Sequence, residues 1–140
     1  MKANMPRVMI VENQAKPMWS AKKLLQSINF EIILETGNGY EAIEKYALIK
    51  PDFILLDLNL SKNDGLDVLK EIKKINNEAK IIIMTSLNDK NQFEECLKYG
   101  SYAILRIPFK MKSFLELVNR PDLTYENHST IAPIIIDEAV

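Results

Sequence analysis

Short apolar runs alternate with stretches of mixed polarity along most of the chain. The runs are apolar almost throughout, which is typical of strands buried on both faces of a parallel sheet. Glu31 interrupts the second run, and this polar position favours an edge strand there. The predicted strands cover residues 8–11, 30–34, 53–56, 81–84 and 102–107.

The stretches between these runs carry apolar residues three and four positions apart, the spacing that puts side chains on one face of a helix. Pro51 is expected to end the second helix, and Gly100 suits a helix C-terminus. The predicted apolar faces are Ala21, Leu24, Leu25 and Ile28; Ala42, Ile43, Tyr46 and Ala47; Leu66, Leu69 and Ile72; Phe93, Cys96 and Leu97; and Phe114, Leu115 and Val118.

A strand followed by a helix therefore occurs five times. This order predicts an α/β domain with a parallel sheet, helices on both faces and right-handed crossovers. The repeat occupies residues 6–119, and residues 120–140 fall outside it. The isoleucine run at 134–136 could be an added strand, a docking segment or part of a disordered tail, and the sequence leaves these alternatives open.

Composition narrows the class of protein. The 140 residues suffice for one compact domain, and a net charge of −1 makes no electrostatic case for nucleic acid or an anionic membrane. One cysteine, Cys96, excludes an internal disulfide framework and favours a cytosolic setting. One histidine, His128, excludes a multi-histidine metal site within one chain. No apolar stretch approaches the roughly 20 residues that a membrane span needs.

Polar residues gather where the predicted strands end. In an open α/β sheet, ligands bind outside the carboxyl ends of the strands. Carboxylate, amide and hydroxyl oxygens on one rim suit Mg²⁺, and a carboxylate beside such a cation can attack a phosphoryl group. The rim residues are Glu12 and Asn13, then Asp57, Leu58 and Asn59, then Thr85 and Ser86, and finally Ile107, Pro108 and Phe109.

Four segments in this order and at this spacing resemble the receiver domain of two-component response regulators, the chemotaxis-regulator-like family. They are residues 8–12, residues 51–60 with Asp64 and Gly65, residues 81–86, and residues 100–109. The resemblance implies a five-stranded, doubly wound, flavodoxin-like fold with strand order 2-1-3-4-5.

The resemblance also implies roles for the rim residues. Asp57 would accept a phosphoryl group from a sensor histidine kinase, and Thr85 would hydrogen-bond that group and move with it. Mg²⁺ would be held by Glu12, Asp57 and the backbone carbonyl of Asn59, with Asn13 at the metal position of the second acid. The output would be an unidentified partner protein or self-association as a homodimer, since no DNA-binding or enzymatic domain follows.

The chain departs from the family pattern at three positions. Asn13 stands where the family has a second acid, Ile107 stands where it has a lysine, and Ile104 occupies the aromatic switch position. An amide in place of a carboxylate should weaken Mg²⁺ binding. A missing lysine removes a charge-assisted hydrogen bond to the phosphoryl group. The first change removes a negative charge and the second removes a positive charge. The formal charges of Glu12 and Asp57 therefore still balance the charge of one Mg²⁺.

A phosphorylated signalling switch is the leading hypothesis. The alternative is a pseudo-receiver, an interaction module that works without phosphorylation, and the departures at Asn13 and Ile107 favour it. A phosphatase of the haloacid-dehalogenase type needs a second acid two residues after its nucleophile, where this chain has Asn59. The chain is therefore not expected to be an enzyme. The glycines at 37 and 39 follow the wrong strand for dinucleotide binding and lack a third glycine.

Overall fold

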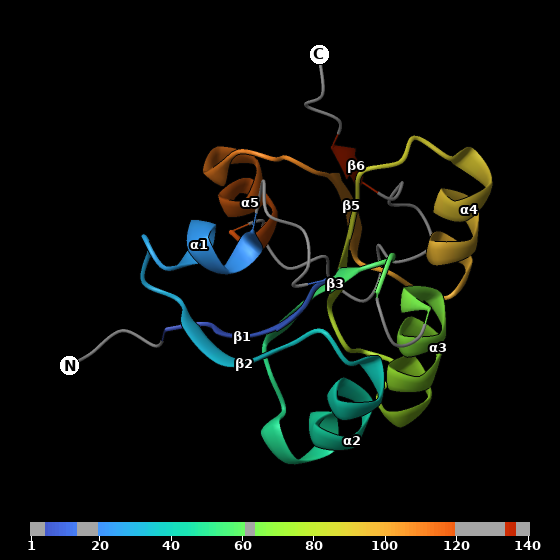
Figure 1. The fold of residues 1–140 in the computed structure, drawn as a ribbon, viewed down its shortest axis with the longest axis horizontal. Coiled ribbons are helices and arrows are strands. Elements are labelled where there is room, and N and C mark those ends of the chain that lie inside the picture. Colours follow the sequence, from blue (N-terminus) through green and yellow to red (C-terminus); the bar gives the residue numbers. More distant parts are fainter. Residues whose placement is uncertain (1–4, 14–19, 61–63, 120–133, 137–140) are drawn as a thin grey trace.

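A computed structural model of the chain describes residues 5–13, 20–60, 64–119 and 134–136. His128 and most of the C-terminal segment lie outside the described residues. Figure 1 shows strands and helices alternating along the chain, as the sequence predicts. In chain order the elements are β1 (Arg7–Val11), α1 (Ala21–Leu25), β2 (Glu31–Thr36), α2 (Gly39–Ile49), β3 (Phe53–Asp57), α3 (Gly65–Ile75), β4 (Ile81–Thr85), α4 (Lys90–Lys98), β5 (Ala103–Arg106), α5 (Met111–Val118) and β6 (Ile134–Ile136).

The sheet has the predicted order for its first five strands and one strand more. Its order is β2-β1-β3-β4-β5-β6, and each neighbouring pair is parallel. β2 is an edge strand, as Glu31 indicated. The predicted order of five strands is confirmed, and Ile134–Ile136 add a sixth strand that pairs with β5. Of the alternatives for that isoleucine run, the structure therefore contains the added strand.

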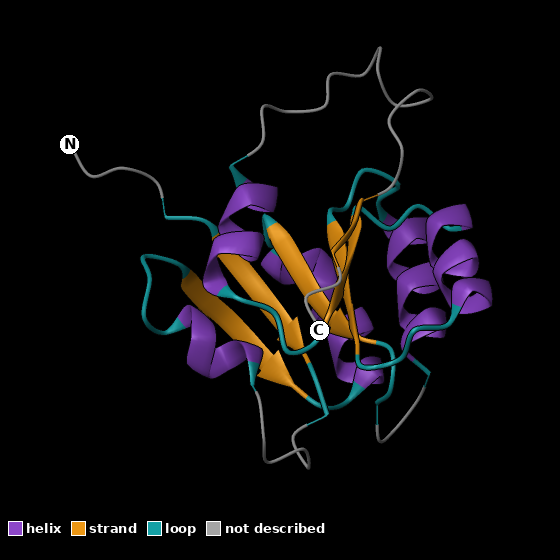
Figure 2. Cartoon of the chain, turned by 90° about the horizontal axis from the view of Figure 1, so that it is seen from above, coloured by secondary structure: helices purple, strands orange, loops and turns teal. Residues whose placement is uncertain are grey.

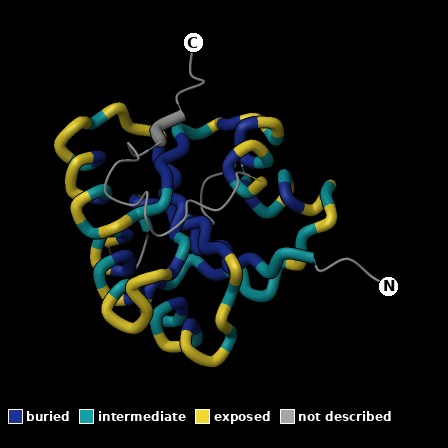
Figure 3. The backbone as a smooth tube through the Cα atoms, turned by 180° about the vertical axis from the view of Figure 1, so that it is seen from behind, coloured by how far each residue is buried: buried dark blue, intermediate teal, exposed yellow. Residues whose placement is uncertain are grey.

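Two apolar clusters fill the space between the sheet and its helices. α1 and α5 lie on one side, and α2, α3 and α4 lie on the other (Figures 1 and 2). Neighbouring residues of one strand enter opposite clusters: Val8 and Ile10 face α1 and α5, while Met9 and Val11 face the other three helices. Figure 3 shows the resulting band of buried backbone along the strands. Burial on both faces explains why these strands are uniformly apolar.

The connection to β6 differs in hand from the other four. β1-α1-β2 runs toward one edge of the sheet with its helix on the first face, and the connections through α2, α3 and α4 run the opposite way on the second face. These four therefore share one hand, which the rule for parallel sheets makes right-handed. The connection from β5 to β6 runs the same way as β3 to β4, but its helix α5 lies on the first face. That connection is consequently left-handed.

Polar side chains cap the N-termini of α2, α3 and α4. Asn38 Oδ1 accepts from the Tyr40 N–H at 2.9 Å, and Asp64 Oδ1 accepts from the Leu66 N–H at 3.0 Å. Asp89 caps α4 in the same way. Each such cap satisfies a backbone donor that lacks a partner within the helix.

Gly100 ends α4 in a left-handed conformation, with φ +91°. The Gly100 N–H donates to Leu97 O and the Ser101 N–H donates to Cys96 O, each at 3.0 Å. This pair of bonds is the Schellman arrangement, which glycine adopts without steric cost. The prediction that Gly100 ends a helix is confirmed.

Two details of the predicted helices are wrong. Ala47 is exposed rather than packed, and Ile49 contacts the cluster instead. α1 ends at Leu25, before Ile28, because the chain tightens into a turn in which the Ile28 N–H donates to Leu25 O at 3.1 Å. Ile28 still packs against the cluster of α1 and α5. Among the described residues, no helix has the length and apolar character needed to cross a membrane.

Gly65 brings the start of α3 against the end of β3. Its N–H donates to Leu58 O at 3.1 Å. A Cβ at this position would collide with the carbonyl oxygen of Asp57 and lie 2.6 Å from Leu58 Cα. Backbone atoms on a buried strand cannot swing aside as a flexible side chain would, so glycine is required here by close approach.

Replacing this glycine should loosen the end of β3. We expect Gly65→Ala to lower the free energy of unfolding by about 1–3 kcal/mol, the usual cost of forcing extra volume into a packed site. Urea unfolding followed by circular dichroism would measure it. Glu71→Ala, at an exposed position of the same helix, is the matched control and should stay within about 0.5 kcal/mol. Equal stability of the two variants would contradict the proposed close packing.

Candidate functional site

Asp57 is the last residue of β3 and is only 3% exposed. β3 lies between β1 and β4, so the carboxylate lies near the middle of the rim formed by the carboxyl ends of the strands. The Asn59 N–H donates to Asp57 Oδ1 at 2.9 Å, and the Asn13 N–H lies 3.4 Å from Oδ2. A buried carboxylate needs such hydrogen bonds to offset its lost hydration. Two backbone donors from different loops thus hold Asp57 in place.

The side chain of Asn13 connects its loop to the loop that follows Asp57. Its Nδ2 donates to the backbone carbonyl of Asn59 at 3.3 Å. The structure therefore brings together three predicted site residues: Asp57, Asn13 and Asn59. A carboxylate, a backbone carbonyl and a side-chain amide meet at one point of the rim, although they come from two separate loops.

Glu12 is buried, but its carboxylate faces the beginning of α1. Oε2 accepts from the Ser20 hydroxyl at 3.0 Å and lies 3.4 Å from the Lys22 N–H, and Oε1 accepts from the Ala21 N–H at 3.1 Å. Both oxygens thus satisfy donors at a helix N-terminus, where negative charge is favoured. Glu12 therefore has a structural role that the sequence analysis did not anticipate.

Ser20 is a residue that the sequence analysis missed. It is the N-cap of α1, and its hydroxyl lies 3.5 Å from the Lys23 N–H while donating to Glu12. A serine immediately before the first residue of an apolar helical face is a recognised N-cap signal. The hydrogen bond from Ser20 to Glu12 has no such sequence signal, because the two residues come together only when the chain folds.

Thr85 ends β4 and is 3% exposed. It follows Met84, the register partner of Asp57, so it lies at the same end of the sheet as Asp57. Thr85 Oγ1 accepts from the Leu87 N–H at 3.1 Å, and its carbonyl accepts from the Ile107 N–H at 2.8 Å. The hydroxyl retains its own proton, which it can donate to a further acceptor.

Two of the positions that depart from the family pattern, Ile104 and Ile107, lie in or just after β5. Ile107 packs against the apolar cluster of α1 and α5, as expected of a rim or core residue. Ile104 is fully buried in the opposite cluster. Arg106 extends toward the end of β4, where Nη2 donates to Ser86 O at 3.3 Å.

The oxygens at this rim bear on whether a metal would fit. Within the described part of the chain, no three histidine, cysteine or acidic side chains group as a metal site. Mg²⁺, however, commonly takes one or two carboxylates and completes its shell with water and substrate oxygens. The Asp57 carboxylate and the Asn59 carbonyl meet that requirement with few protein ligands. The Asn13 amide, whose nitrogen faces the Asn59 carbonyl, would present its oxygen after the amide group turns over.

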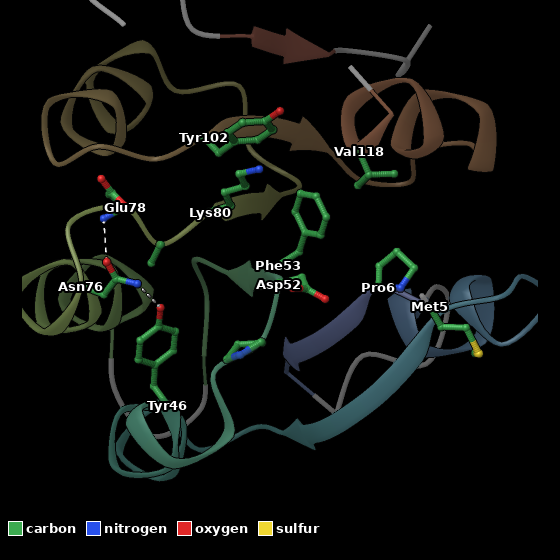
Figure 4. Close-up of a pocket in the computed structure, with 12 residues that line it drawn as sticks. Met5, Pro6, Tyr46, Asp52, Phe53, Asn76, Glu78, Lys80, Tyr102 and Val118 are labelled. Atoms are coloured by element: carbon green, nitrogen blue, oxygen red, sulfur yellow. Dashed lines mark hydrogen bonds between the residues drawn. The ribbon is translucent and has the colours of Figure 1, made fainter. Parts of the chain in front are cut away.

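A pocket of about 540 Å³ lies at the amino ends of the strands, opposite the rim that holds Asp57 (Figure 4). Phe53 and Tyr102 line it near the starts of their strands, and Lys80 Nζ lies 5.5 and 5.9 Å from their ring centroids. Asn76 Nδ2 donates to the Tyr46 hydroxyl at 3.0 Å on another side. This pocket is remote from Asp57, because the rim site lies at the carboxyl ends of the strands.

Cys96 is buried in the cluster of α2, α3 and α4. Burial raises the pKa of its thiol to about 11, and the negative charges of Glu95 and Asp64 add to the effect. Since the thiolate is the reactive form, this cysteine is a packing residue, as the sequence analysis held.

Comparison with known proteins agrees with this fold and rim. The model of the family described as "Response regulator receiver domain" matches residues 8–119. The chemotaxis protein CheY of Thermotoga maritima is 32% identical over 114 residues, which cover 81% of this chain and 95% of that protein. CheY of Bacillus subtilis is 31% identical with the same coverage.

Solved structures show the same fold. The CheX–CheY–BeF3–Mg²⁺ complex from Borrelia burgdorferi matches with a TM-score of 0.72 at 25% identity, covering 80% of this chain and 85% of that one. A LuxR-family DNA-binding response regulator from Staphylococcus aureus also gives a TM-score of 0.72, at 26% identity, covering 82% of this chain and 97% of that one.

A flavodoxin-like sheet with an aspartate at the end of its third strand defines the class of two-component signalling domains. The chain belongs to the response regulator receiver domain family, and the chemotaxis proteins named CheY are among its relatives. Receiver domains are generally signalling modules rather than enzymes, and they typically bind Mg²⁺ at their acidic site.

The role of Glu12 at α1 can be tested by stability. We expect Glu12→Ala to cost about 1–3 kcal/mol, because the buried Ala21 N–H loses its acceptor. Glu12→Gln keeps one acceptor oxygen and should cost less. Glu116→Ala, at an exposed position of α5, is the control. Urea unfolding should give the same loss with and without a chelator; a loss seen only when Mg²⁺ is present would mean that Glu12 acts through the metal.

Proposed function

We propose that this receiver domain is a phosphorylation switch in which Asp57 accepts a phosphoryl group from a sensor histidine kinase. A carboxylate oxygen of Asp57 attacks the phosphorus, the phosphorus–nitrogen bond of the phosphohistidine breaks, and the imidazole nitrogen keeps the electron pair. The observation that carries the proposal is the placement of Asp57, which lies buried at the middle of the rim with each oxygen facing a backbone N–H.

The proposed Mg²⁺ ligands are the Asp57 carboxylate, the Asn59 carbonyl and the amide oxygen of Asn13. Bound there, the metal would neutralise charge on the phosphoryl oxygens during transfer. Glu12 is left out of the direct ligands because its carboxylate is turned toward the beginning of α1, away from Asp57 and Asn59. Binding is expected to be weak, since a single carboxylate contacts the ion.

The charge balance at the rim supports transfer despite the two replacements. A site with three carboxylates is formally balanced by Mg²⁺ and one lysine. Asn13 removes one negative charge and Ile107 removes one positive charge, so Glu12 and Asp57 remain formally balanced by Mg²⁺ alone. The aspartyl phosphate would lack the charge-assisted hydrogen bond of a lysine, which should weaken its hold on the phosphoryl oxygens.

Thr85 is the proposed link from the phosphoryl group to the surface. Its hydroxyl can donate to a phosphoryl oxygen while still accepting from the Leu87 N–H. Leu87 is 54% exposed and lies between β4 and α4. A shift of Thr85 would therefore move an exposed apolar residue at the entrance to α4. This mechanism does not need an aromatic residue at Ile104.

The proposed output is contact with a second protein on the face formed by α4, β5 and α5. The Borrelia relative, whose structure is a complex of CheY with CheX, supports this kind of output. A pseudo-receiver that works without phosphorylation is not favoured by the family match, and it is the outcome that the first experiment below would reveal.

Phosphorylation can be tested directly by mass. We expect incubation with acetyl phosphate and Mg²⁺ to add one phosphoryl group to the intact protein, because the Asp57 carboxylate is a nucleophile held on the rim. Asp57→Asn should abolish the adduct. Asp64→Asn is the matched control: it changes an exposed capping aspartate to another good capping residue, and the adduct should persist. An adduct that survives Asp57→Asn would place the acceptor elsewhere, and no adduct in the parent protein would favour the pseudo-receiver.

Metal binding tests the role assigned to Asn13. We expect Asn13→Asp to raise Mg²⁺ affinity by about tenfold or more, because a second carboxylate would face the ion. Asn59→Ala should change the affinity little, since Asn59 contributes its backbone carbonyl. Isothermal titration calorimetry in low-salt buffer would measure both. Equal affinities of Asn13→Asp and the parent protein would place the metal away from this residue.

A further inference from the structure

β6 covers an edge of the sheet that would otherwise be open. Its three residues pair in parallel with β5, Ala103 with Ile134, Ile104 with Ile135 and Leu105 with Ile136. Without β6, the outer backbone groups of β5 would have no strand beside them. An open strand edge is a template on which another strand can pair.

The chain reaches β6 by an unfavourable route. The connection from β5 through α5 to β6 is left-handed, whereas about 98% of parallel connections in one sheet are right-handed. The preference arises because a right-handed helix packs back onto a right-twisted sheet in only one sense. A strand that comes from another molecule has no connection to its neighbour and escapes this constraint.

The connecting segment is long enough to reach a second molecule. The Tyr102 hydroxyl, just before β5, lies 3.4 Å from Leu117 O near the end of α5. Ile134, the first residue of β6, pairs with Ala103 at that same edge of the sheet. Residues 120–133 supply fourteen positions between these neighbouring points, and fourteen extended residues span up to about 46–50 Å.

We propose that the edge of β5 is a docking surface for the Ile134–Ile136 strand of a second copy of this chain. Two copies exchange these strands reciprocally, and each β5 receives the β6 of its partner. The backbone pairing is the same as within one chain, while the left-handed connection disappears. The exchange involves neither Asp57 nor the proposed metal ligands, so it stands independently of the proposed phosphorylation.

The concentration at which exchange should occur can be estimated. A flexible linker holds its strand at an effective concentration on the order of 1 mM, and longer linkers hold it at less. The bias against left-handed connections, about fifty to one, works in the other direction. Exchange between copies should therefore overtake pairing within one chain at protein concentrations below about 1 mM.

Cysteine pairs distinguish exchange from pairing within one chain. Register partners on parallel strands have Cα atoms about 4.8 Å apart, which suits a disulfide. We expect a mixture of Ala103→Cys protein with Ile134→Cys protein, air-oxidised at about 100 µM, to form a covalent heterodimer on a non-reducing gel. Each variant oxidised alone should remain a monomer. Cys96 is 1% exposed and should not compete.

The double variant Ala103→Cys/Ile134→Cys reports the opposite arrangement. An internally cross-linked monomer from the double variant, with no heterodimer from the mixture, would overturn the proposal. The absence of any cross-link in either experiment would also overturn it, because the strand would then not pair with β5 at all.

Truncation gives an independent measurement. Light scattering across about 5–500 µM should show a mass that doubles with concentration for the parent chain. A chain ending at residue 133 should remain a monomer throughout, and a chain ending at Ile136 should still dimerise. A dimer of the chain that ends at residue 133 would place the contact outside β6.

Discussion

The hydrogen bonding of one buried carboxylate constrains much of the fold around it. Asp57 ends a strand that is buried on both faces, so its charge has to be offset by groups that arrive from elsewhere. The backbone N–H groups of Asn13 and Asn59 do this, and they are available because two loops leave the sheet at this point. Gly65 then allows α3 to start directly behind the carboxylate.

The same rim divides its polar groups between structure and chemistry. Glu12 is used by α1, which needs acceptors for its first N–H groups, whereas the Asp57 oxygens face the backbone N–H groups of Asn13 and Asn59. Thr85 combines the two tasks, since its hydroxyl accepts a bond from the loop before α4 and can donate another. The acids of the rim are therefore distinguished by their hydrogen-bond partners rather than by their residue type.

How far the sequence could predict this structure depended on how local each signal was. The apolar strands and the glycine at the end of α4 act through neighbouring residues, and these five strands and Gly100 were predicted correctly. The order of the five strands, also correct, was implied by the resemblance to receiver domains. The contact of Glu12 with Ser20 and the pairing of β6 with β5 could not be predicted. Both depend on segments that meet only after folding, and three isoleucines in a row fit an added strand, a docking segment and a tail equally well.

The chain has two unusual features, and they lie at different places on the sheet. One is the pair of replacements at the carboxyl ends of the strands, and the other is the extra strand beside β5. Asn13 and Ile107 change the charges at the carboxyl ends of the strands, where phosphoryl chemistry would take place. β6 changes the side of β5, where receiver output would be read. The Thr85 carbonyl accepts from the Ile107 N–H beside the end of β5, so the proposed shift of Thr85 would act on the strand that β6 covers. In the proposed mechanism, a strand paired with β5 should resist that movement.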